Sequence, residues 1–167
     1  MDNGKRLYSP YKLLTYGFLA GFVGTLTFHQ LSLWLMWKAG IAPFGPYNMS
    51  GTLPWGIPAV ISLALWGGVW GVLFALILSR FERPGNYWGK AFGFGAVFPS
   101  LVALLIVAPI KGHPMGGGWH WPLLLTVFLI NGMWGIGTGV LLSLFLKISR
   151  SHRLPTPECG PGVVCGP

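Results

Sequence analysis

The sequence predicts an all-α membrane protein of four transmembrane helices, and three observations lead to this fold class. Of the 167 residues, 53% are hydrophobic and only 8% are charged, whereas soluble domains carry roughly 25% charged residues. The hydrophobic residues form four runs, each about as long as the roughly 20 residues that one membrane crossing needs. These runs and their connections use nearly the whole chain, which leaves no room for a separate soluble domain. Lipid is therefore the expected solvent for most of the chain.

The expected helices follow from these runs in order. The first run, residues 13–37, is too long for a signal-peptide core and is not followed by a small-residue cleavage site, so it predicts a retained helix. The later runs predict helices at 58–79, 88–110 and 122–148. Pro99, inside the third run, should kink or locally open that helix because it removes one backbone hydrogen bond. The expected divisions are a cytoplasmic segment 1–12, a transmembrane domain 13–148 with hairpins 13–79 and 88–148, and a flexible cytoplasmic tail 149–167.

The orientation follows from the basic residues, because Lys and Arg near the ends of spans are retained in the cytoplasm. Of the 11 basic residues, only Lys38 and Lys111 fall on the side of the two long connections. The other nine fall on the side of the termini: Lys5, Arg6, Lys12, Arg80, Arg83, Lys90, Lys147, Arg150 and Arg153. We therefore expect both termini in the cytoplasm.

An internal repeat links the two hairpins. Trp55-x-x-Pro58 precedes the second helix and Trp119-x-x-Pro122 precedes the fourth, 64 residues later. The same spacing separates Gly68-x-Trp70-Gly71 from Gly132-x-Trp134-Gly135. Residues 12–18 and 90–94 show a looser similarity with unequal spacing. We interpret the pattern as a duplicated helical hairpin, whose two copies have the same orientation and are related by an axis along the membrane normal.

Small residues at a spacing of four occur in every expected helix, and such pairs allow close helix contact in lipid. The expected packing residues are Gly17, Gly21, Gly67, Gly71, Gly89, Gly93, Gly135 and Gly139.

Ionisable groups are scarce within the expected spans. The three carboxylates, Asp2, Glu82 and Glu158, all fall outside them, which disfavours a buried carboxylate relay and a di-metal carboxylate site. Neither a Ser/His/Asp arrangement nor an H-E-x-x-H motif is present, so we do not expect an enzyme. The net charge of +8 comes from basic residues at the ends of the runs, which is typical of a membrane protein and does not indicate nucleic-acid binding.

His29 is the one ionisable side chain well inside an expected span, about 12 Å below its outer end, with Gln30 beside it. A buried imidazole can ligate a haem or chlorophyll-type pigment, hydrogen-bond a substrate, or bond a neighbouring helix. The third role is favoured, because a second haem ligand would have to come from His113 or His120 in the outer loop, at a different depth. No cofactor is therefore expected, and His29 is the residue that would bind one.

Two further groups of donors could in principle bind a metal. His113, Met115 and His120 are suited to copper, but they lie in a loop with many glycines that we expect to be flexible. Cys159 and Cys165 in the tail supply only half of a tetrahedral site. We therefore expect no metal site.

The chain resembles uncharacterised four-helix bacterial inner-membrane proteins with a duplicated helical hairpin. The residues that carry the resemblance are at 17–25, 67–79, 88–95 and 132–139, and it extends over most of residues 13–146. At the middle of the second and fourth helices, where the family pattern leads us to expect histidine, this chain has Trp66 and Asn131. The resemblance implies a multi-pass protein of the cell inner membrane and supplies no activity.

Two functions are open. The favoured one is a non-catalytic accessory or scaffolding subunit of a larger membrane complex, which contacts the lipid bilayer and other membrane subunits or copies of itself. The alternative is a small-molecule transporter or channel that acts as a homo-oligomer, with His29, Gln30 and Asn131 as the polar lining of a path.

Overall fold

The computed structural model describes residues 9–52, 54–78 and 86–151. Within these residues four helices are long and apolar enough to cross a membrane, which confirms the expected number of spans. They cover Pro10–Lys38, Ala59–Leu78, Tyr87–Ile110 and Trp121–Ser149. The chain is therefore built as a multi-pass membrane protein.

The first and third spans are each interrupted by a π-helical segment. The first consists of α1 (Pro10–Gly24), the π-helical η1 (Thr25–His29) and α2 (Gln30–Lys38). The third consists of α4 (Tyr87–Val102), the π-helical η3 (Ala103–Val107) and α5 (Ala108–Ile110). The second is the single helix α3 (Ala59–Leu78), and the fourth lies within α6 (Trp121–Ser151). A π turn inserts one extra residue into a helix, so η1 and η3 change the direction of the side chains that follow them.

Proline and glycine mark several helix ends. Pro10 begins α1, where its fixed φ suits a helix and its missing N–H costs no bond. Pro122 is the second residue of α6, whereas Pro58 pairs in a short strand and directly precedes α3. Gly40 follows α2 with φ +73°, and the Ile41 N–H behind it bonds to the Met36 carbonyl at 2.9 Å. This left-handed glycine ends α2 as glycine commonly ends helices.

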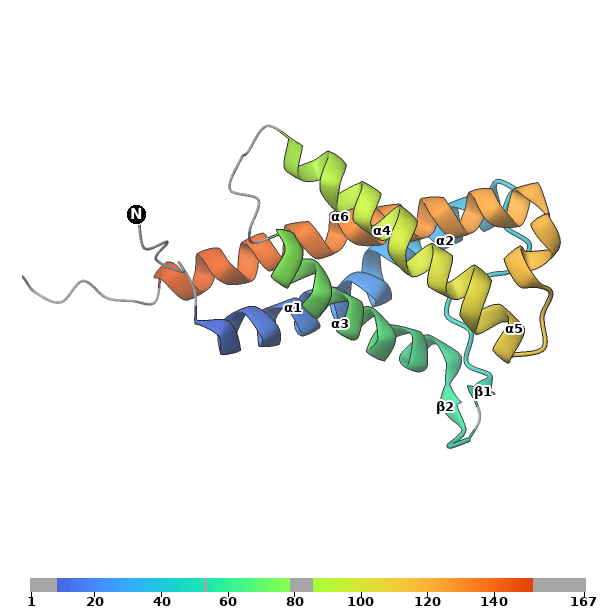
Figure 1. Ribbon diagram of the computed structural model, residues 1–167, viewed down its shortest axis with the longest axis horizontal. Coiled ribbons are helices and arrows are strands. Elements are labelled where there is room, and N and C mark those ends of the chain that lie inside the picture. Colours follow the sequence, from blue (N-terminus) through green and yellow to red (C-terminus); the bar gives the residue numbers. More distant parts are fainter. Residues whose placement is uncertain (1–8, 53, 79–85, 152–167) are drawn as a thin grey trace, which may run out of the picture.

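The helices form two antiparallel pairs, α1 with α3 and α4 with α6, and α1 also packs along α6. The start of α1 and the end of α6 lie at the same end of the molecule, which we call the terminal side (Figure 1). There Lys12 Nζ donates a hydrogen bond to Ser149 Oγ at 2.9 Å. The opposite end, the loop side, carries the segments 39–58 and 111–120.

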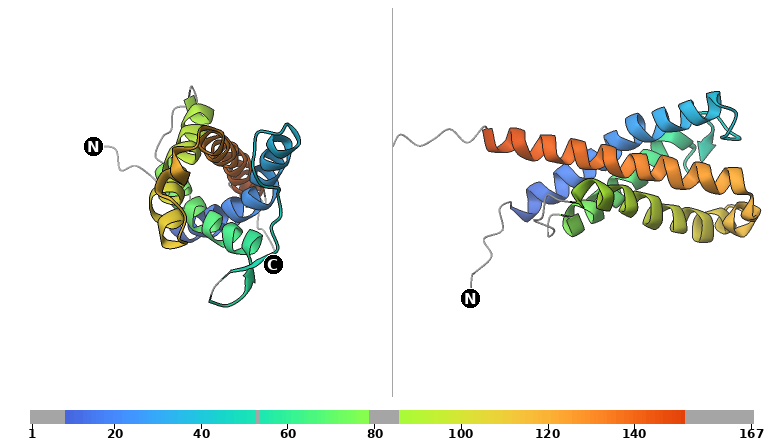
Figure 2. Two further views of the ribbon diagram at one scale, coloured as in Figure 1. Left: turned by 90° about the vertical axis from the view of Figure 1, so that its right-hand side faces the viewer. Right: turned by 90° about the horizontal axis from the view of Figure 1, so that it is seen from above.

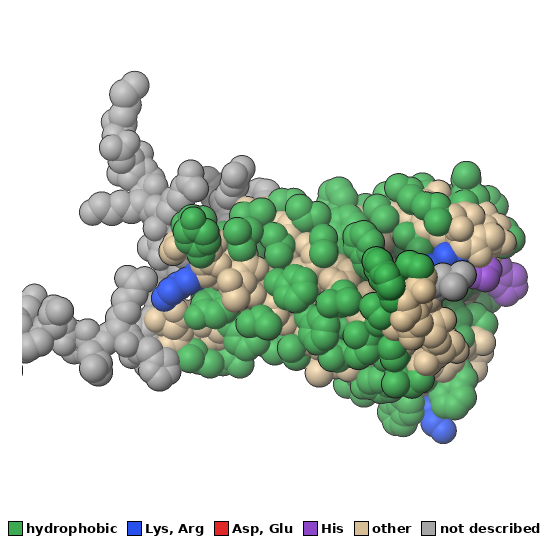
Figure 3. Space-filling view, turned by 90° about the horizontal axis from the view of Figure 1, so that it is seen from below, with side chains coloured by type: hydrophobic (Ala, Val, Ile, Leu, Met, Phe, Trp, Pro, Cys, Tyr) green, Lys and Arg blue, Asp and Glu red, His purple; other side chains and the backbone are tan. Residues whose placement is uncertain are grey.

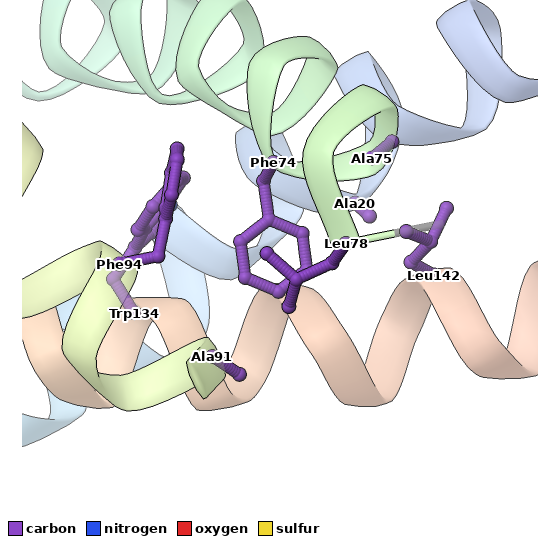
Figure 4. Close-up of a cluster of buried hydrophobic side chains, with 8 residues drawn as sticks. All are labelled: Ala20, Phe74, Ala75, Leu78, Ala91, Phe94, Trp134 and Leu142. Atoms are coloured by element: carbon purple, nitrogen blue, oxygen red, sulfur yellow. The ribbon is translucent and has the colours of Figure 1, made fainter. Parts of the chain in front are cut away.

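The main apolar core lies in the half of the bundle nearer the terminal side, and all four helices contribute to it (Figure 4). Its buried residues are Ala20, Phe74, Ala75, Leu78, Ala91, Phe94, Trp134 and Leu142. Phe74 is fully buried and meets the ring of Phe94 edge-on at 5.4 Å between centroids. Toward the loop side the helices spread apart (Figure 2), and a small second cluster of Leu33, Ala42 and Ile130 is buried there. The bundle is thus tight on the terminal side and more open on the loop side.

The face of the bundle seen in Figure 3 is largely apolar between its two ends. Leucines, valines and aromatic residues are exposed along the helices. Lys12, Lys90 and Lys147 lie toward the terminal side. On the loop side, Lys38 ends the first span and Lys111 directly follows the third. An apolar belt between polar ends matches a bilayer as the surrounding solvent.

Candidate functional site

In the first hairpin, four glycines bring two helix backbones into direct contact. The Cα of Gly71 lies 2.8 Å from the place where a Cβ on Gly21 would stand, and that Cβ would also overlap the Gly67 carbonyl. A Cβ on Gly71 would overlap the Gly17 carbonyl. Any side chain at these positions would push α1 and α3 apart. The two pairs, Gly17 with Gly21 and Gly67 with Gly71, lie together as a helix-packing site requires.

The second hairpin makes the corresponding contacts with different residues. A Cβ on Gly95 would overlap the Asn131 carbonyl, and one on Gly135 would overlap the Ala91 carbonyl. Ala91 and Gly95 therefore form the small-residue pair of α4. A search for small residues at a spacing of four that had included alanine would have found this pair.

The structure places three of the expected packing glycines away from such contacts. A Cβ on Gly93 would meet nothing within 4 Å, and the nearest atoms to one on Gly89 belong to Asn86, just before the same helix. Gly139 lies against the side chains of Tyr87 and Phe74, with 3.1 Å from its Cβ position to the Tyr87 hydroxyl. In α4 the close helix contact is therefore made at Ala91 and Gly95, because those residues face α6.

His29 and Gln30 form a buried polar pair where η1 meets α2. They are only 6% and 2% exposed, and Gln30 Nε2 lies 3.3 Å from His29 Nδ1. Gln30 Oε1 accepts a hydrogen bond from the backbone N–H of Tyr47 at 2.7 Å. Gln30 thus links the imidazole to the loop 39–50. Both ends of its side-chain amide, Nε2 and Oε1, have a partner within the chain.

Tyr47 ties the same loop to the π-helical segment. Its hydroxyl donates to the Leu26 carbonyl in η1 at 3.0 Å, and its backbone is left-handed with φ +53°, which is uncommon for a residue with a side chain. Two bonds from one loop residue hold this conformation in place. Sequence reasoning did not identify Tyr47, because no local motif marks a loop residue that binds a helix about 20 positions away.

This cluster has the geometry of a structural clasp. A hollow of about 290 Å³ opens beside it, lined by Thr27, Phe28, Leu31 and Tyr47. Neither His29 nor Gln30 lines that hollow, since both are buried on the inner side of the helix. The imidazole therefore faces packed protein, and the hollow presents mainly apolar groups.

The histidines and the methionine of the second loop lie on the surface of the loop side. Met115 is 57% exposed, and His113 and His120 are also exposed. Between them lies a single left-handed turn, in which φ is +57° to +68° at Gly116, Gly117, Gly118 and Trp119. The N–H of Gly117 donates a hydrogen bond to the Pro114 carbonyl at 3.0 Å and closes the start of this turn. The glycines, which we expected to make the loop flexible, adopt a left-handed turn here, since glycine has no Cβ to oppose positive φ.

Donors for a metal do not gather in the described part of the chain: there, no group of three or more His, Cys, Asp or Glu residues lies together. Several residues considered above lie outside the described part of the chain: Cys159, Cys165, Asp2, Glu82, Glu158, Lys5, Arg6, Arg80, Arg83 and Arg153.

Comparison with protein-family models, with curated proteins and with solved structures finds no match.

Proposed function

We propose that the chain is a non-catalytic subunit that supports a larger membrane protein complex through lateral helix contacts. The observation that carries the proposal is the filled interior of the bundle. Helix backbones touch at Gly21 and Gly71, and Trp134 is only 2% exposed at the centre. Such packing leaves the outward-facing side chains as the means of interaction, and in lipid these act through shape complementarity and a few hydrogen bonds.

The alternative, a homo-oligomeric transporter or channel, draws less support from the same contacts. Its three expected polar lining residues already have partners within the chain. His29 and Gln30 bond to each other, Gln30 also holds Tyr47, and Asn131 Nδ2 donates to Ser100 Oγ at 3.0 Å. Polar groups that hold helices and loops together are not free to line a path.

The proposal includes the duplicated hairpin, and paired contacts support it. Three contacts recur when 74 is added to residues of the first helix and 64 to residues of the second. Gly17 with Gly71 becomes Ala91 with Gly135, and Gly21 with Gly71 becomes Gly95 with Gly135. Likewise, Phe18 covers Gly68 as Phe92 covers Gly132. The constant spacing of 74 replaces the unequal spacing that the sequence suggested for the first and third helices.

The proposal also places the protein in a bacterial inner membrane with its terminal side in the cytoplasm, which rests on the basic residues and the resemblance. Alkaline phosphatase fused after Ser151 should be inactive, and the same reporter inserted between Gly117 and Gly118 should be active. The reverse pattern would show that the orientation is inverted.

We further propose that His29 is a structural residue and binds no cofactor, which its position in the clasp supports. Protein purified from cells that make haem and chlorophyll-type pigments should then be colourless. Visible absorbance that is lost in His29→Ala but kept in His113→Ala would refute this assignment.

The subunit proposal is tested by native-gel migration after mild detergent extraction from the source membrane. We expect the chain in a band well above the size of one copy. Migration as a single copy, in every mild detergent tried, would refute the proposal. A band that contains this chain alone and supports substrate flux in liposomes would favour the transporter.

A further inference from the structure

Trp66 has an unusual position for a tryptophan. It is the eighth residue of α3, about 10 Å along the helix from its start, and its side chain is 64% exposed. At this depth the indole faces hydrocarbon, although tryptophan favours the interface, where its N–H stays hydrated. In the described part of the chain the Trp66 indole makes no hydrogen bond, whereas Trp134 Nε1 donates to the Gly21 carbonyl at 3.0 Å. The large ring of Trp66 is therefore apolar surface available for packing against another helix in lipid, where helix association depends on van der Waals contact.

The second hairpin shows what covers the matching position. Adding 64 to Trp66 gives Ile130, which is only 4% exposed and lies in one cluster with Leu33 of α2. In the proposed repeat, Leu33 of the first helix corresponds to Val107 of the third, 74 residues later. The contact between Leu33 and Ile130 would therefore correspond to a contact between Val107 and Trp66. Both of these are exposed instead, Val107 by 38%. In one hairpin an apolar helix covers the position, and in the other the described helices leave it open.

A shallow apolar hollow lies beside Trp66. Phe18, Leu65 and Val69 line it together with Trp66, and its volume is about 230 Å³ with an apolar lining. The protruding indole and the hollow therefore lie on one face at one depth. Two copies in one membrane with the same orientation can be related by a two-fold axis along the membrane normal, which preserves depth. A projection and a hollow at equal depth on one face are self-complementary under such an axis.

We propose that a second copy of the chain docks on this face, with Trp66 of each copy in the hollow beside Trp66 of the other. The contact covers the indole and supplies an apolar helix where α2 supplies one in the second hairpin. This inference rests on the proposed lateral-packing function and deepens it by naming one partner.

Cross-linking of the full chain in membranes tests the contact. In a background of Cys159→Ser and Cys165→Ser, Val69→Cys should give a disulfide-linked dimer when a mild oxidant is added. Met133→Cys is the matched control, because it lies 64 residues later and is also lipid-facing, with exposures of 47% for Val69 and 37% for Met133. A dimer at residue 69 that persists on tenfold dilution with lipid supports the proposal. Absent or equal cross-linking at the two positions overturns it.

The role of the indole is tested separately by self-association in detergent. Trp66→Ala should weaken dimerisation by about tenfold, which corresponds to a typical buried aromatic contact, while Met133→Ala should leave it unchanged. Thermal unfolding of Trp66→Ala, measured at a dilution where both proteins are single copies, should match that of the unaltered protein, because the side chain is mostly exposed in one copy. An unchanged dimerisation constant overturns the assignment of Trp66 to the interface.

The two proposals fail in different ways. A large native complex without the dimer cross-link overturns docking of a second copy and leaves the subunit function standing. Migration as a single copy, without cross-linking, overturns both.

Discussion

On the terminal side the two hairpins are built alike, whereas on the loop side they are held by different means. Near the termini both use backbone contact at small residues, Gly21 against Gly71 in one and Gly95 against Gly135 in the other. On the loop side the first hairpin holds its loop by side chains, through Gln30 and Tyr47. The second uses a left-handed glycine turn. Close contact between helix backbones requires small residues, so the two hairpins share it. A loop can be held by side-chain hydrogen bonds or by a glycine turn, and the two hairpins therefore differ on the loop side.

Two positions within the shared contact differ, since Gly17 corresponds to Ala91 and Gly67 to Asn131. Gly67 of α3 corresponds to Asn131 of α6, and each carbonyl lies against the small residue of the neighbouring helix. The Asn131 side chain turns aside to donate to Ser100 Oγ, and Ser100 Oγ lies 3.3 Å from the Val127 carbonyl, to which it donates. Where glycine allows contact by having no side chain, asparagine allows it by a hydrogen bond that keeps its side chain out of the backbone contact.

The largest expected effect comes from filling the shared contact. Gly71→Leu and Gly135→Leu should each destabilise the protein by about 1–3 kcal/mol through overpacking, because in each case the added Cβ overlaps a backbone carbonyl. Gly93→Leu is the matched control, since nothing lies within 4 Å of its Cβ position. Unfolding in mixed micelles, followed by helical circular dichroism, measures the difference. If Gly93→Leu is as damaging as the other two, the contact is not the cause.

The glycine turn of the second loop comes next in size. Gly117→Ala should cost about 1–2 kcal/mol, because the alanine must keep left-handed backbone and its Cβ would overlap the Leu123 side chain. Gly45→Ala provides the comparison, because Gly45 does not have a positive φ. The nearest atom to a Cβ at Gly45 is in the Trp37 ring, at an ordinary contact distance of 3.6 Å. The same unfolding measurement applies to both. Equal stability of the two variants would mean that the turn is not held in this conformation.

The clasp of the first loop should show a smaller effect. Tyr47→Phe removes only the hydrogen bond to the Leu26 carbonyl, which should cost about 1 kcal/mol. Limited proteolysis from the loop side should then cut residues 39–50 faster, with the rate in the second loop unchanged. Cleavage that does not accelerate would show that the bond to Gln30 is enough to hold the loop.

Sequence reasoning predicted the four spans because hydrophobic length is a direct consequence of the bilayer. It identified Gly17, Gly21, Gly67 and Gly71 because spacing alone places small residues on one face of a helix. It chose Gly89 and Gly93 in α4, where Ala91 and Gly95 make the contact, because spacing does not say which face meets a neighbour. The π-helical segments, the left-handed turn and the bonds of Tyr47 depend on tertiary contacts, so no local pattern signals them. Pro99 was expected to open its helix locally, and the π-helical η3 begins four residues after it.

The smallest effect concerns Asn131, the polar residue of the shared contact. The bond from Asn131 Nδ2 to Ser100 Oγ joins α6 to α4 inside the membrane, where such bonds contribute about 0.6 kcal/mol on average. A double-mutant cycle with Ser100→Ala and Asn131→Ala should give a coupling of about that size. Asn131→Gly makes the second hairpin match the first at this position, so it should lose the bond yet keep the helix contact. Because glycine in a helix interior costs about 0.5–1 kcal/mol more than alanine, we expect Asn131→Gly to be less stable than Asn131→Ala by about that amount and no more. If the glycine variant is much the less stable of the two, the two hairpins do not share one contact geometry, and the correspondence between Gly67 and Asn131 must be given up.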